Sequence, residues 1–260
     1  MVELQSFNKN EKPSWCPGCG NFAISLATKK SISELNIKPK DSVLVSGVGC
    51  FAKLPYWIKS YGFVGLHGRS LPVAQGTKLA NKKLTVIAYG GDGDGYGEGG
   101  NHFIHACRRN VNITYLVHNN SVFGLTTGQY SPTSKQGKVS KSSPLGAKES
   151  PLNPIALAIS SGAKFVARGY AGDINHLTGL IKKAIQFEGF AFIDILQYCP
   201  SFGHDIKYYN ERVYRLEDNF HDSSNKILAL QKAFEIEENK NDRLAIGVFY
   251  KSQWINTQII

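Results

Sequence analysis

One glycine-rich turn between two apolar segments constrains this chain more than any other feature. Residues 84–88 form an apolar run typical of a buried strand and lead into the segment Gly90-Gly91-Asp92-Gly93-Asp94. A helix is expected at about residues 98–109, followed by a second apolar run at 113–117 that ends in Asn119-Asn120. This strand–turn–helix–strand unit places the turn and the asparagines at the carboxyl ends of neighbouring strands, where ligands bind in open α/β sheets.

The two aspartates of the turn decide what it can bind. Two carboxylates would repel a phosphate group unless a cation lay between them. Mg²⁺ prefers carboxylate, amide and carbonyl oxygens together with substrate phosphates. Asp92 from the first strand end and Asn120 from the second supply such oxygens. The sequence therefore predicts a diphosphate site that is bridged by a metal ion.

Helices and strands alternate with short connections, which predicts an α/β fold with a doubly wound, mostly parallel sheet. We expect a single domain over residues 1–260, a length that can bury a full core. Residues 51–62 have a mixed pattern compatible with a helix, and residues 201–222 are expected to be irregular. The further strands are expected at residues 42–46, 165–169, 190–196 and 244–250, and the further helices at about 21–35, 72–81, 153–162, 176–187 and 225–237.

A long polar segment, about residues 121–152, follows the asparagines and is rich in Ser, Thr, Lys, Gly and Pro. Long segments without regular structure inside a compact domain are usually functional lids or else disordered. Because this segment begins directly at the expected diphosphate site, we expect it to cover that site.

The formal net charge of +10 is the least ordinary bulk property of the chain. A generally basic surface that partly serves phosphate cofactors explains it, and attraction of an acidic partner is the alternative. No RNA-binding or helix-turn-helix signature is found, so we expect no nucleic-acid partner. We find no signal peptide and no apolar run approaching ~18 residues, so we expect a cytoplasmic protein that does not enter a membrane.

Four of the five cysteines suit a metal or cluster site. Cys16 and Cys19 form a C-x-x-C knuckle within about residues 13–20, Cys50 follows a glycine turn, and Cys199 precedes a proline at another strand end. Thiolates on loops at one sheet edge suit a [4Fe–4S] cluster or Zn²⁺, and the spacing alone leaves both open. A thioredoxin-like dithiol is disfavoured because no strand precedes the knuckle. Cys107, within an expected helix, is interpreted as a core residue.

Eight short motifs occur together in order along the chain. In this combination the chain resembles the β subunit of an archaeal-type 2-oxoacid:ferredoxin oxidoreductase, from about residue 13 to 250. The motifs are Trp-Cys-Pro-Gly-Cys-Gly-Asn at 15–21, Gly-x-Gly-Cys-x-x-Lys at 47–53, His-Gly-Arg at 67–69, Gly-Gly-Asp-Gly-Asp at 90–94, Gly-Leu-Thr-x-Gly-Gln at 124–129, Ser-Pro-Thr at 131–133, Asn-Pro-Ile-Ala-Leu-Ala-Ile-Ser-Ser-Gly at 153–162 and Phe-Val-Ala-Arg-Gly-Tyr at 165–170.

The resemblance implies a thiamine diphosphate-binding fold with three cofactors: thiamine diphosphate, Mg²⁺ and one [4Fe–4S] cluster. It implies that Asp92, the Asn120 side chain and the Val122 carbonyl ligate Mg²⁺. It also favours iron–sulfur over zinc, with the cluster held by Cys16, Cys19, Cys50 and Cys199. The other residues expected to line the cofactor are His67, Gly91, Gly93, Asp94, Gly124, Leu125 and Thr126, together with Cys50.

Lys53 and His67 are the two residues expected to act on the reacting groups. A cation at Lys53 attracts a 2-oxoacid carboxylate or a cofactor phosphate, and a solvated surface charge is the alternative. His67 is expected to contact the diphosphate. Two departures from the family pattern concern the substrate pocket: Thr127 stands where some relatives have a lysine, and Phe51-Ala52 replaces a small polar pair.

The implied activity is coenzyme A-dependent oxidative decarboxylation of 2-oxoacids, pyruvate or 2-oxoglutarate among them, with electrons passed through the cluster to ferredoxin. Thiamine enzymes need a glutamate against the aminopyrimidine ring of the cofactor. The family places it in an α or fused γα subunit, so the resemblance implies an αβ or (αβ)2 assembly in which this chain alone is inactive.

Three other functions compete with this one. A non-redox thiamine decarboxylase would leave the cysteines without a purpose. A non-catalytic iron–sulfur or zinc electron-transfer module would leave Asp92 and Asn120 without one. A nicotinamide or flavin Rossmann enzyme is disfavoured, because the G-x-G-x-x-G at 95–100 precedes a strand that ends in asparagines rather than in an acidic ribose ligand.

Overall fold

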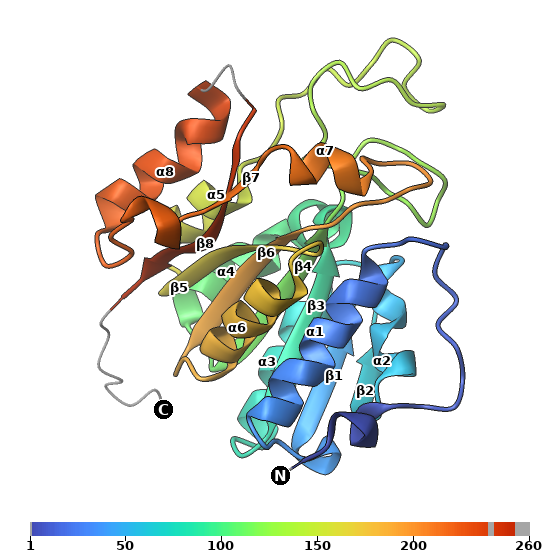
Figure 1. Cartoon of the computed structure of the whole chain (residues 1–260), viewed down its shortest axis with the longest axis vertical. Coiled ribbons are helices and arrows are strands. Elements are labelled where there is room, and N and C mark those ends of the chain that lie inside the picture. Colours follow the sequence, from blue (N-terminus) through green and yellow to red (C-terminus); the bar gives the residue numbers. More distant parts are fainter. Residues whose placement is uncertain (1, 239–241, 253–260) are drawn as a thin grey trace.

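A single mixed sheet organises the molecule (Figure 1). The computed structural model describes residues 2–238 and 242–252, and within these ranges eight strands form one sheet in the order β2-β1-β3-β4-β6-β5-β8-β7. Every pairing is parallel except that of β5 with β8, which is antiparallel. The mostly parallel α/β sheet predicted from the sequence is confirmed. The strands are β1 Ser42–Ser46, β2 Tyr61–Val64, β3 Thr85–Gly91, β4 Ile113–Asn119, β5 Phe165–Tyr170, β6 Phe190–Leu196, β7 Val213–Arg215 and β8 Leu244–Lys251.

Helices cover both faces of the sheet. One face carries α1, α2 and α6, and the other carries α3, α4, α5 and α8, so the sheet is doubly wound (Figure 1). Short α7 lies after the end of β6 and packs through Tyr209. The helices are α1 Asn21–Glu34, α2 Leu54–Trp57, α3 Ser70–Ala80, α4 Gly100–Arg109, α5 Pro154–Ser160, α6 Ile174–Ile185, α7 Ile206–Asn210 and α8 Lys226–Glu238.

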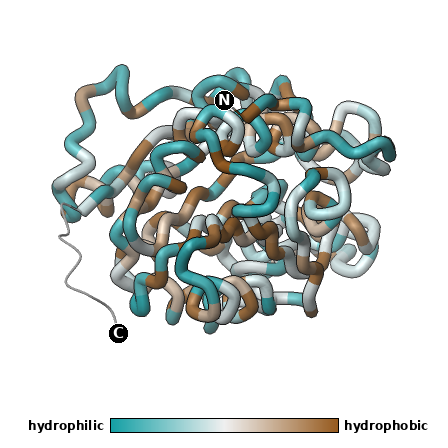
Figure 2. Tube along the Cα trace, turned by 90° about the horizontal axis from the view of Figure 1, so that it is seen from below, coloured by the Kyte–Doolittle hydropathy of each residue, from teal (hydrophilic) through white to brown (hydrophobic). Residues whose placement is uncertain are grey.

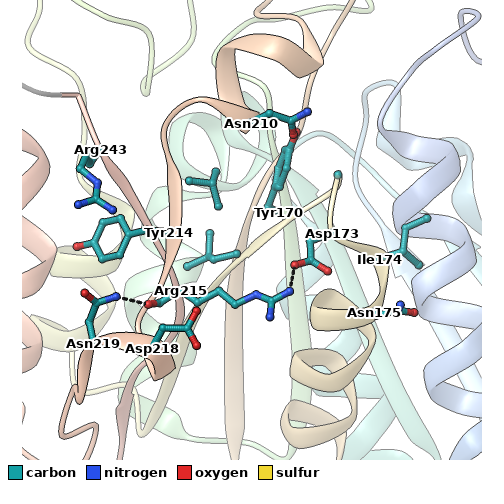
Figure 3. A pocket seen from close by; sticks show the side chains of 13 residues that line it. Tyr170, Asp173, Ile174, Asn175, Asn210, Tyr214, Arg215, Asp218, Asn219 and Arg243 are labelled. Atoms are coloured by element: carbon teal, nitrogen blue, oxygen red, sulfur yellow. Dashed lines mark hydrogen bonds and ion pairs between the residues drawn. The ribbon is translucent and has the colours of Figure 1, made fainter.

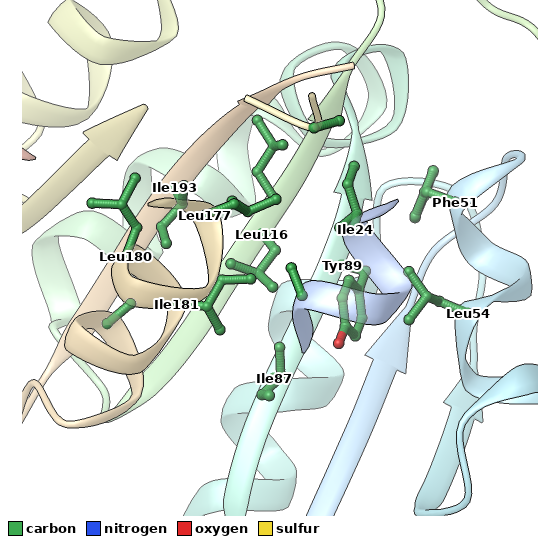
Figure 4. Close-up of a cluster of buried hydrophobic side chains, with 14 of the residues drawn as sticks. Ile24, Phe51, Leu54, Ile87, Tyr89, Leu116, Leu177, Leu180, Ile181 and Ile193 are labelled. Atoms are coloured by element: carbon green, nitrogen blue, oxygen red, sulfur yellow. The ribbon is translucent and has the colours of Figure 1, made fainter. Parts of the chain in front are cut away.

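The hydrophobic core lies on both faces of the central strands. Strands β4 and β6 are buried along their whole length, as expected for strands covered by helices on both sides. Figure 4 shows Leu177 and Ile181 of α6 packed beside Leu116 of β4 and Ile193 of β6. Apolar residues concentrate on the inner segments of the trace and hydrophilic ones on its outer turns (Figure 2). Among the described residues, no helix is long and apolar enough to cross a membrane.

Two edge strands, β2 and β7, were not predicted from the sequence. Strand β2 overlaps the end of the segment 51–62 that was expected to be mixed, and it has only four residues, all of them exposed. Strand β7 has only three residues and lies within the segment expected to be irregular, as does α7. Short, exposed edge strands lack the periodic pattern that identifies buried ones.

The chain after β3 makes one π-helical turn, Gly93–Glu98, before α4 begins at Gly100. We expected one helix from about residue 98, so the turn itself is more regular than predicted. Single π-helical turns occur frequently at functional sites.

The parallel strands bring their carboxyl ends to one edge. Gly91 at the end of β3 is in register with His118 of β4, and Asn119 is in register with Leu196 of β6. Strand β2 lies on one side of β1, and the next strand in the chain, β3, lies on the other side of β1. The strand order therefore reverses direction at a topological switch point between β1 and β3. Ligands of open α/β sheets bind at such points.

Candidate active site

The glycine turn, the asparagine loop and one cysteine line a single pocket of about 120 Å³ at this edge. We call it the cofactor pocket. All the residues predicted to bind the cofactor line it: Cys50, His67, Gly91, Asp92, Gly93, Asp94, Asn120, Val122, Gly124, Leu125 and Thr126. These positions extend from residue 50 to residue 126 of the sequence, so their convergence follows from the sheet topology.

Asp92 directly precedes the π-helical turn and is only 1 % exposed. Its Oδ2 atom accepts hydrogen bonds from Ser131 Oγ and from Thr133 Oγ1, the latter at 2.7 Å. Burial raises the pKa of the Asp92 carboxyl to about 6, and these two hydrogen bonds offset part of that rise. The charged carboxylate is therefore costly here unless a cation compensates for it.

The loop after the asparagines is fastened to this carboxylate. Ser131 and Thr133 both belong to the segment 121–152, which contains no helix or strand. Thr133 Oγ1 also lies 2.8 Å from Asn119 Oδ1, so the loop contacts the ends of β3 and β4 at once. The polar segment thus packs over the carboxyl edge of the sheet.

Asp94 holds three segments together. Its Oδ1 atom accepts hydrogen bonds from the backbone N–H groups of Val48, at 2.9 Å, and of Gly68, at 2.8 Å. Burial raises the pKa of Asp94, and those two hydrogen bonds lower it in part. A Cβ atom at Gly47 would lie 2.3 Å from Asp94 Oδ1, so only glycine permits this approach. The Asp94 Oδ2 atom is buried without a hydrogen-bond partner and remains available to a ligand.

The asparagine loop and an aromatic side chain form one wall of the pocket. Asn120 Oδ1 accepts a hydrogen bond from the Val122 N–H at 3.1 Å, which folds the loop onto its own side chain. The Phe123 ring stacks on His67 with 6.2 Å between centroids. A Cβ atom at Gly93 would lie 2.2 Å from the Phe123 ring, so the turn and this ring are in close contact.

The four predicted cluster cysteines come together beside the pocket. Cys50 Sγ and Cys199 Sγ lie 3.7 and 4.0 Å from the point where a Cβ atom at Gly124 would stand. Burial and, to a smaller extent, the negative charges of Cys199, Cys50 and Cys16 raise the pKa of the Cys19 thiol to about 11. Trp15 Nε1 donates a hydrogen bond to the Cys50 carbonyl at 2.7 Å, which ties the knuckle to the β1 loop. Within the described ranges, no three His, Cys, Asp or Glu side chains form a group that could hold a metal ion.

Lys53, unlike the residues predicted to bind the cofactor, does not line the cofactor pocket. Its Nζ atom donates to the Ser14 carbonyl at 3.2 Å and lies 3.3 Å from Ser14 Oγ. The ammonium group therefore contacts the segment before the cysteine knuckle. Its positive charge lowers the pKa of the Cys50 thiol, against the larger effect of burial. A substrate role for Lys53 stays a prediction.

Several polar residues that the sequence analysis missed support the site. Asp194 of β6 is fully buried and pairs with Arg168 Nε of β5 at 3.0 Å. Its Oδ1 atom accepts hydrogen bonds from Tyr96 Oη at 2.9 Å and Asn119 Nδ2 at 3.0 Å. A lone charge within an apolar strand run, as in residues 190–196, is the signal that could have identified Asp194.

Two further residues that the sequence analysis missed, His118 and Gln197, line the cofactor pocket. His118 Nδ1 lies 2.7 Å from Asn21 Oδ1, and burial lowers the pKa of this imidazole to about 3, so it is neutral. Gln197 lines the cofactor pocket and donates to Cys19 Sγ. Both lie within or next to strand ends that we had identified, but no local pattern distinguishes them from core residues.

A larger pocket of about 710 Å³ lies between the start of α6 and strands β7 and β8 (Figure 3). Arg215 pairs with Asp173 across it, and the Arg243 guanidinium lies 4.4 Å from the centre of the Tyr214 ring. None of the predicted site residues lines this pocket.

The chain matches known families along most of its length. Residues 46–195 match the thiamine pyrophosphate enzyme, C-terminal TPP binding domain, and residues 199–258 match the C-terminal region of the pyruvate ferredoxin oxidoreductase beta subunit. A 2-oxoacid:ferredoxin oxidoreductase subunit beta from Saccharolobus solfataricus is 48% identical, over 96% of this chain and 85% of the relative. The chain belongs to the family of 2-oxoacid:ferredoxin oxidoreductase β subunits. The resemblance inferred from the motifs is confirmed.

A second relative and a solved structure support the same family assignment. Subunit beta of 2-oxoacid:ferredoxin oxidoreductase 1 from Aeropyrum pernix is 44% identical, over 95% of this chain and 80% of the relative. A solved structure, the 2-oxoglutarate:ferredoxin oxidoreductase from Magnetococcus marinus with 2-oxoglutarate, coenzyme A and succinyl-CoA bound, superimposes with a TM-score of 0.92. It is 36% identical and is matched over 97% of this chain and 86% of that chain. This β subunit is therefore part of an oxidoreductase and has a thiamine diphosphate-binding fold.

Proposed function

We propose that this β subunit binds thiamine diphosphate with Mg²⁺ and one [4Fe–4S] cluster, and that with an α or fused γα subunit it oxidatively decarboxylates 2-oxoacids. Coenzyme A accepts the acyl group and ferredoxin the electrons. Pyruvate and 2-oxoglutarate are the substrates we would test first. The observation that carries the proposal is the cofactor pocket, in which Asp92 and Asn120 share one lining with the cluster residue Cys50.

The magnesium part of the proposal is supported by the donor set. Asp92 is a buried carboxylate, and the Asn120 amide oxygen and the Val122 loop lie in the same lining. These are the oxygen ligands that Mg²⁺ prefers, with the remaining positions left for phosphates and water. The residues present therefore fit a diphosphate that is held through the metal.

The cluster part is supported by the proximity of four thiols. Cys16, Cys19, Cys50 and Cys199 are close enough for their charges to act on one another, and thiolates so placed repel each other unless a cation or cluster lies between them. Cysteine thiolates are the usual ligands of a [4Fe–4S] cluster, so these four side chains fit that group.

Each part of the site has a separate task. When bound, thiamine diphosphate supplies the electron sink that decarboxylation of a 2-oxoacid requires. Asp92 and Asn120 orient the diphosphate through the metal, and His67 faces the same pocket with Phe123 stacked on it. Phe51 and Phe123 line the pocket with apolar surface and so exclude water from the reacting groups.

The pocket lacks one carboxylate that the proposed chemistry needs. Within the described ranges, Asp92 and Asp94 are the acidic residues of its lining, and both belong to the glycine turn. We therefore place the activating glutamate on the α-type subunit, in an αβ or (αβ)2 assembly. Exposed apolar side chains at Tyr61, Phe63 and Leu66 lie on the segment that leads to His67 and suit such an interface.

The proposal also covers domain organisation and location. One sheet with a core on both faces supports a single cofactor-binding domain over residues 1–260. All five cysteines lie in the described ranges and are unpaired, which suits a reducing compartment such as the cytoplasm.

The function is tested by co-expressing this chain with an α-type subunit and measuring dye reduction without oxygen. We expect reduction that requires both a 2-oxoacid and coenzyme A, and none from the isolated chain loaded with both cofactors. The same complex without coenzyme A is the matched control. If no 2-oxoacid reduces the dye while cluster and thiamine diphosphate are fully occupied, the proposal fails.

The cluster is tested by the substitution Cys199→Ser. A serine oxygen is a poor ligand for the soft iron of a cluster, so we expect loss of iron and sulfide and of the absorbance of the cluster. Cys107→Ser is the matched control, because Cys107 lies buried in α4 away from the cofactor pocket. Equal iron content in wild type and Cys199→Ser would contradict the assignment of this ligand.

A further inference from the structure

Gln197 lies between the cysteine knuckle and the cofactor pocket. It directly follows β6, its side chain is only 2 % exposed, and it forms part of the pocket lining. Its Nε2 atom donates a hydrogen bond to Cys19 Sγ at 3.5 Å. One amide side chain thus contacts a predicted cluster ligand and faces the site of the cofactor.

The amide is held firmly in this position. The Gln197 N–H donates to the Asn119 carbonyl at 2.8 Å, which fixes the backbone against the end of β4. On the opposite side, a Cβ atom at Gly20 would lie 2.8 Å from Gln197 Cγ, so the knuckle backbone packs directly on the side chain. The Gly20 N–H in turn donates to the Tyr198 carbonyl at 3.2 Å. The side chain therefore has little freedom to turn away from Cys19.

We propose that Gln197 is a positioning residue that raises the reduction potential of the [4Fe–4S] cluster through its hydrogen bond to Cys19 Sγ. This role rests on the proposed cluster. A reduced cluster carries more negative charge on its sulfurs than an oxidised one, so an N–H donor stabilises the reduced form more. A higher potential makes the cluster a better electron acceptor from the cofactor, toward which the same side chain faces.

The test is a redox titration of the purified complex with the α-type subunit, followed by electron paramagnetic resonance without oxygen. Gln197→Met keeps length and apolar volume but has no donor. For Gln197→Met we expect full iron and sulfide content. At a given applied potential, the ratio of reduced to oxidised cluster should be about tenfold lower than in the wild type. For a one-electron couple, this corresponds to a reduction potential about 59 mV lower. Gln197→Glu, which replaces the donor with a negative charge, should shift the potential further in the same direction.

Gln186→Met is the matched control, because Gln186 is exposed at the end of α6. The reduction potential of the cluster in this variant should equal that of the wild type. An unchanged potential in Gln197→Met with full iron content overturns the tuning role. Loss of iron from Gln197→Met also overturns it, since the amide would then hold the cluster rather than tune it. A wild-type complex without iron and sulfide overturns the proposed cluster itself, which is a different failure.

Discussion

Replacing Asp92 with asparagine should abolish the magnesium-dependent retention of thiamine diphosphate. The substitution keeps the shape and one oxygen of the side chain but removes the charge that attracts Mg²⁺. Changes to residues that only support a metal ligand typically cost about 10- to 100-fold in metal affinity, so loss of a charged ligand should cost at least about 100-fold. Activity of the complex should fall below detection at millimolar Mg²⁺.

The same substitution should not destabilise the protein without cofactors. Burial raises the pKa of Asp92 to about 6, so its charged form opposes folding near neutral pH, and asparagine removes that cost. Gel filtration with bound thiamine diphosphate, with and without chelator, measures retention, and thermal unfolding measures stability. Asp218→Asn is the matched control, because Asp218 is exposed. Wild-type retention by Asp92→Asn would remove the metal role assigned to this residue.

Replacing Asp194 with alanine should produce the largest loss of stability. The variant leaves Arg168, a residue only 5 % exposed, without its carboxylate, and it removes the shared acceptor of Tyr96 and Asn119. Breaking one partner of a buried ion pair costs about 3 to 5 kcal/mol, because an uncompensated charge remains in the interior. Retention of the cofactor should also weaken, since Asn119 contacts Thr133, which reaches Asp92.

Urea unfolding of the purified complex measures this loss, together with the yield of soluble protein. Glu34→Ala is the matched control, since it breaks an ion pair with Lys182 in which both side chains are substantially exposed. Exposed pairs contribute about 0 to 1 kcal/mol, so the control should stay near the wild type. A loss below about 1 kcal/mol in Asp194→Ala would show that the pair does not support the site.

The strongest sequence predictions concerned features that are local in the chain. The buried strands β1 and β6 were predicted with the bounds that the structure has, because mostly apolar runs identify strands covered on both faces. The glycine turn and the asparagines were predicted to meet, and residues 91–94 line one pocket with Asn120. Parallel pairing alone requires this, since the strands that carry them are neighbours in the sheet.

The contacts that could not be predicted join residues far apart in loops. Ser131 and Thr133 reach Asp92 because an irregular segment turns back over the sheet, and the path of such a segment leaves no periodic pattern in the sequence. Lys53 contacts Ser14 rather than the pocket because the direction of a long, flexible side chain depends on its neighbours in space.

The sequence by itself determined the family, the mostly parallel sheet and the glycine turn with its aspartates. Each of these depends on residues that are adjacent in the chain or repeat with a regular period. Only the tertiary structure decided which polar groups support the turn: the hydroxyls of the covering loop, the Arg168–Asp194 pair and the amide of Gln197 between knuckle and pocket. A buried polar group is stable only when its partners are supplied, and those partners come from whichever strands and loops the fold makes neighbours.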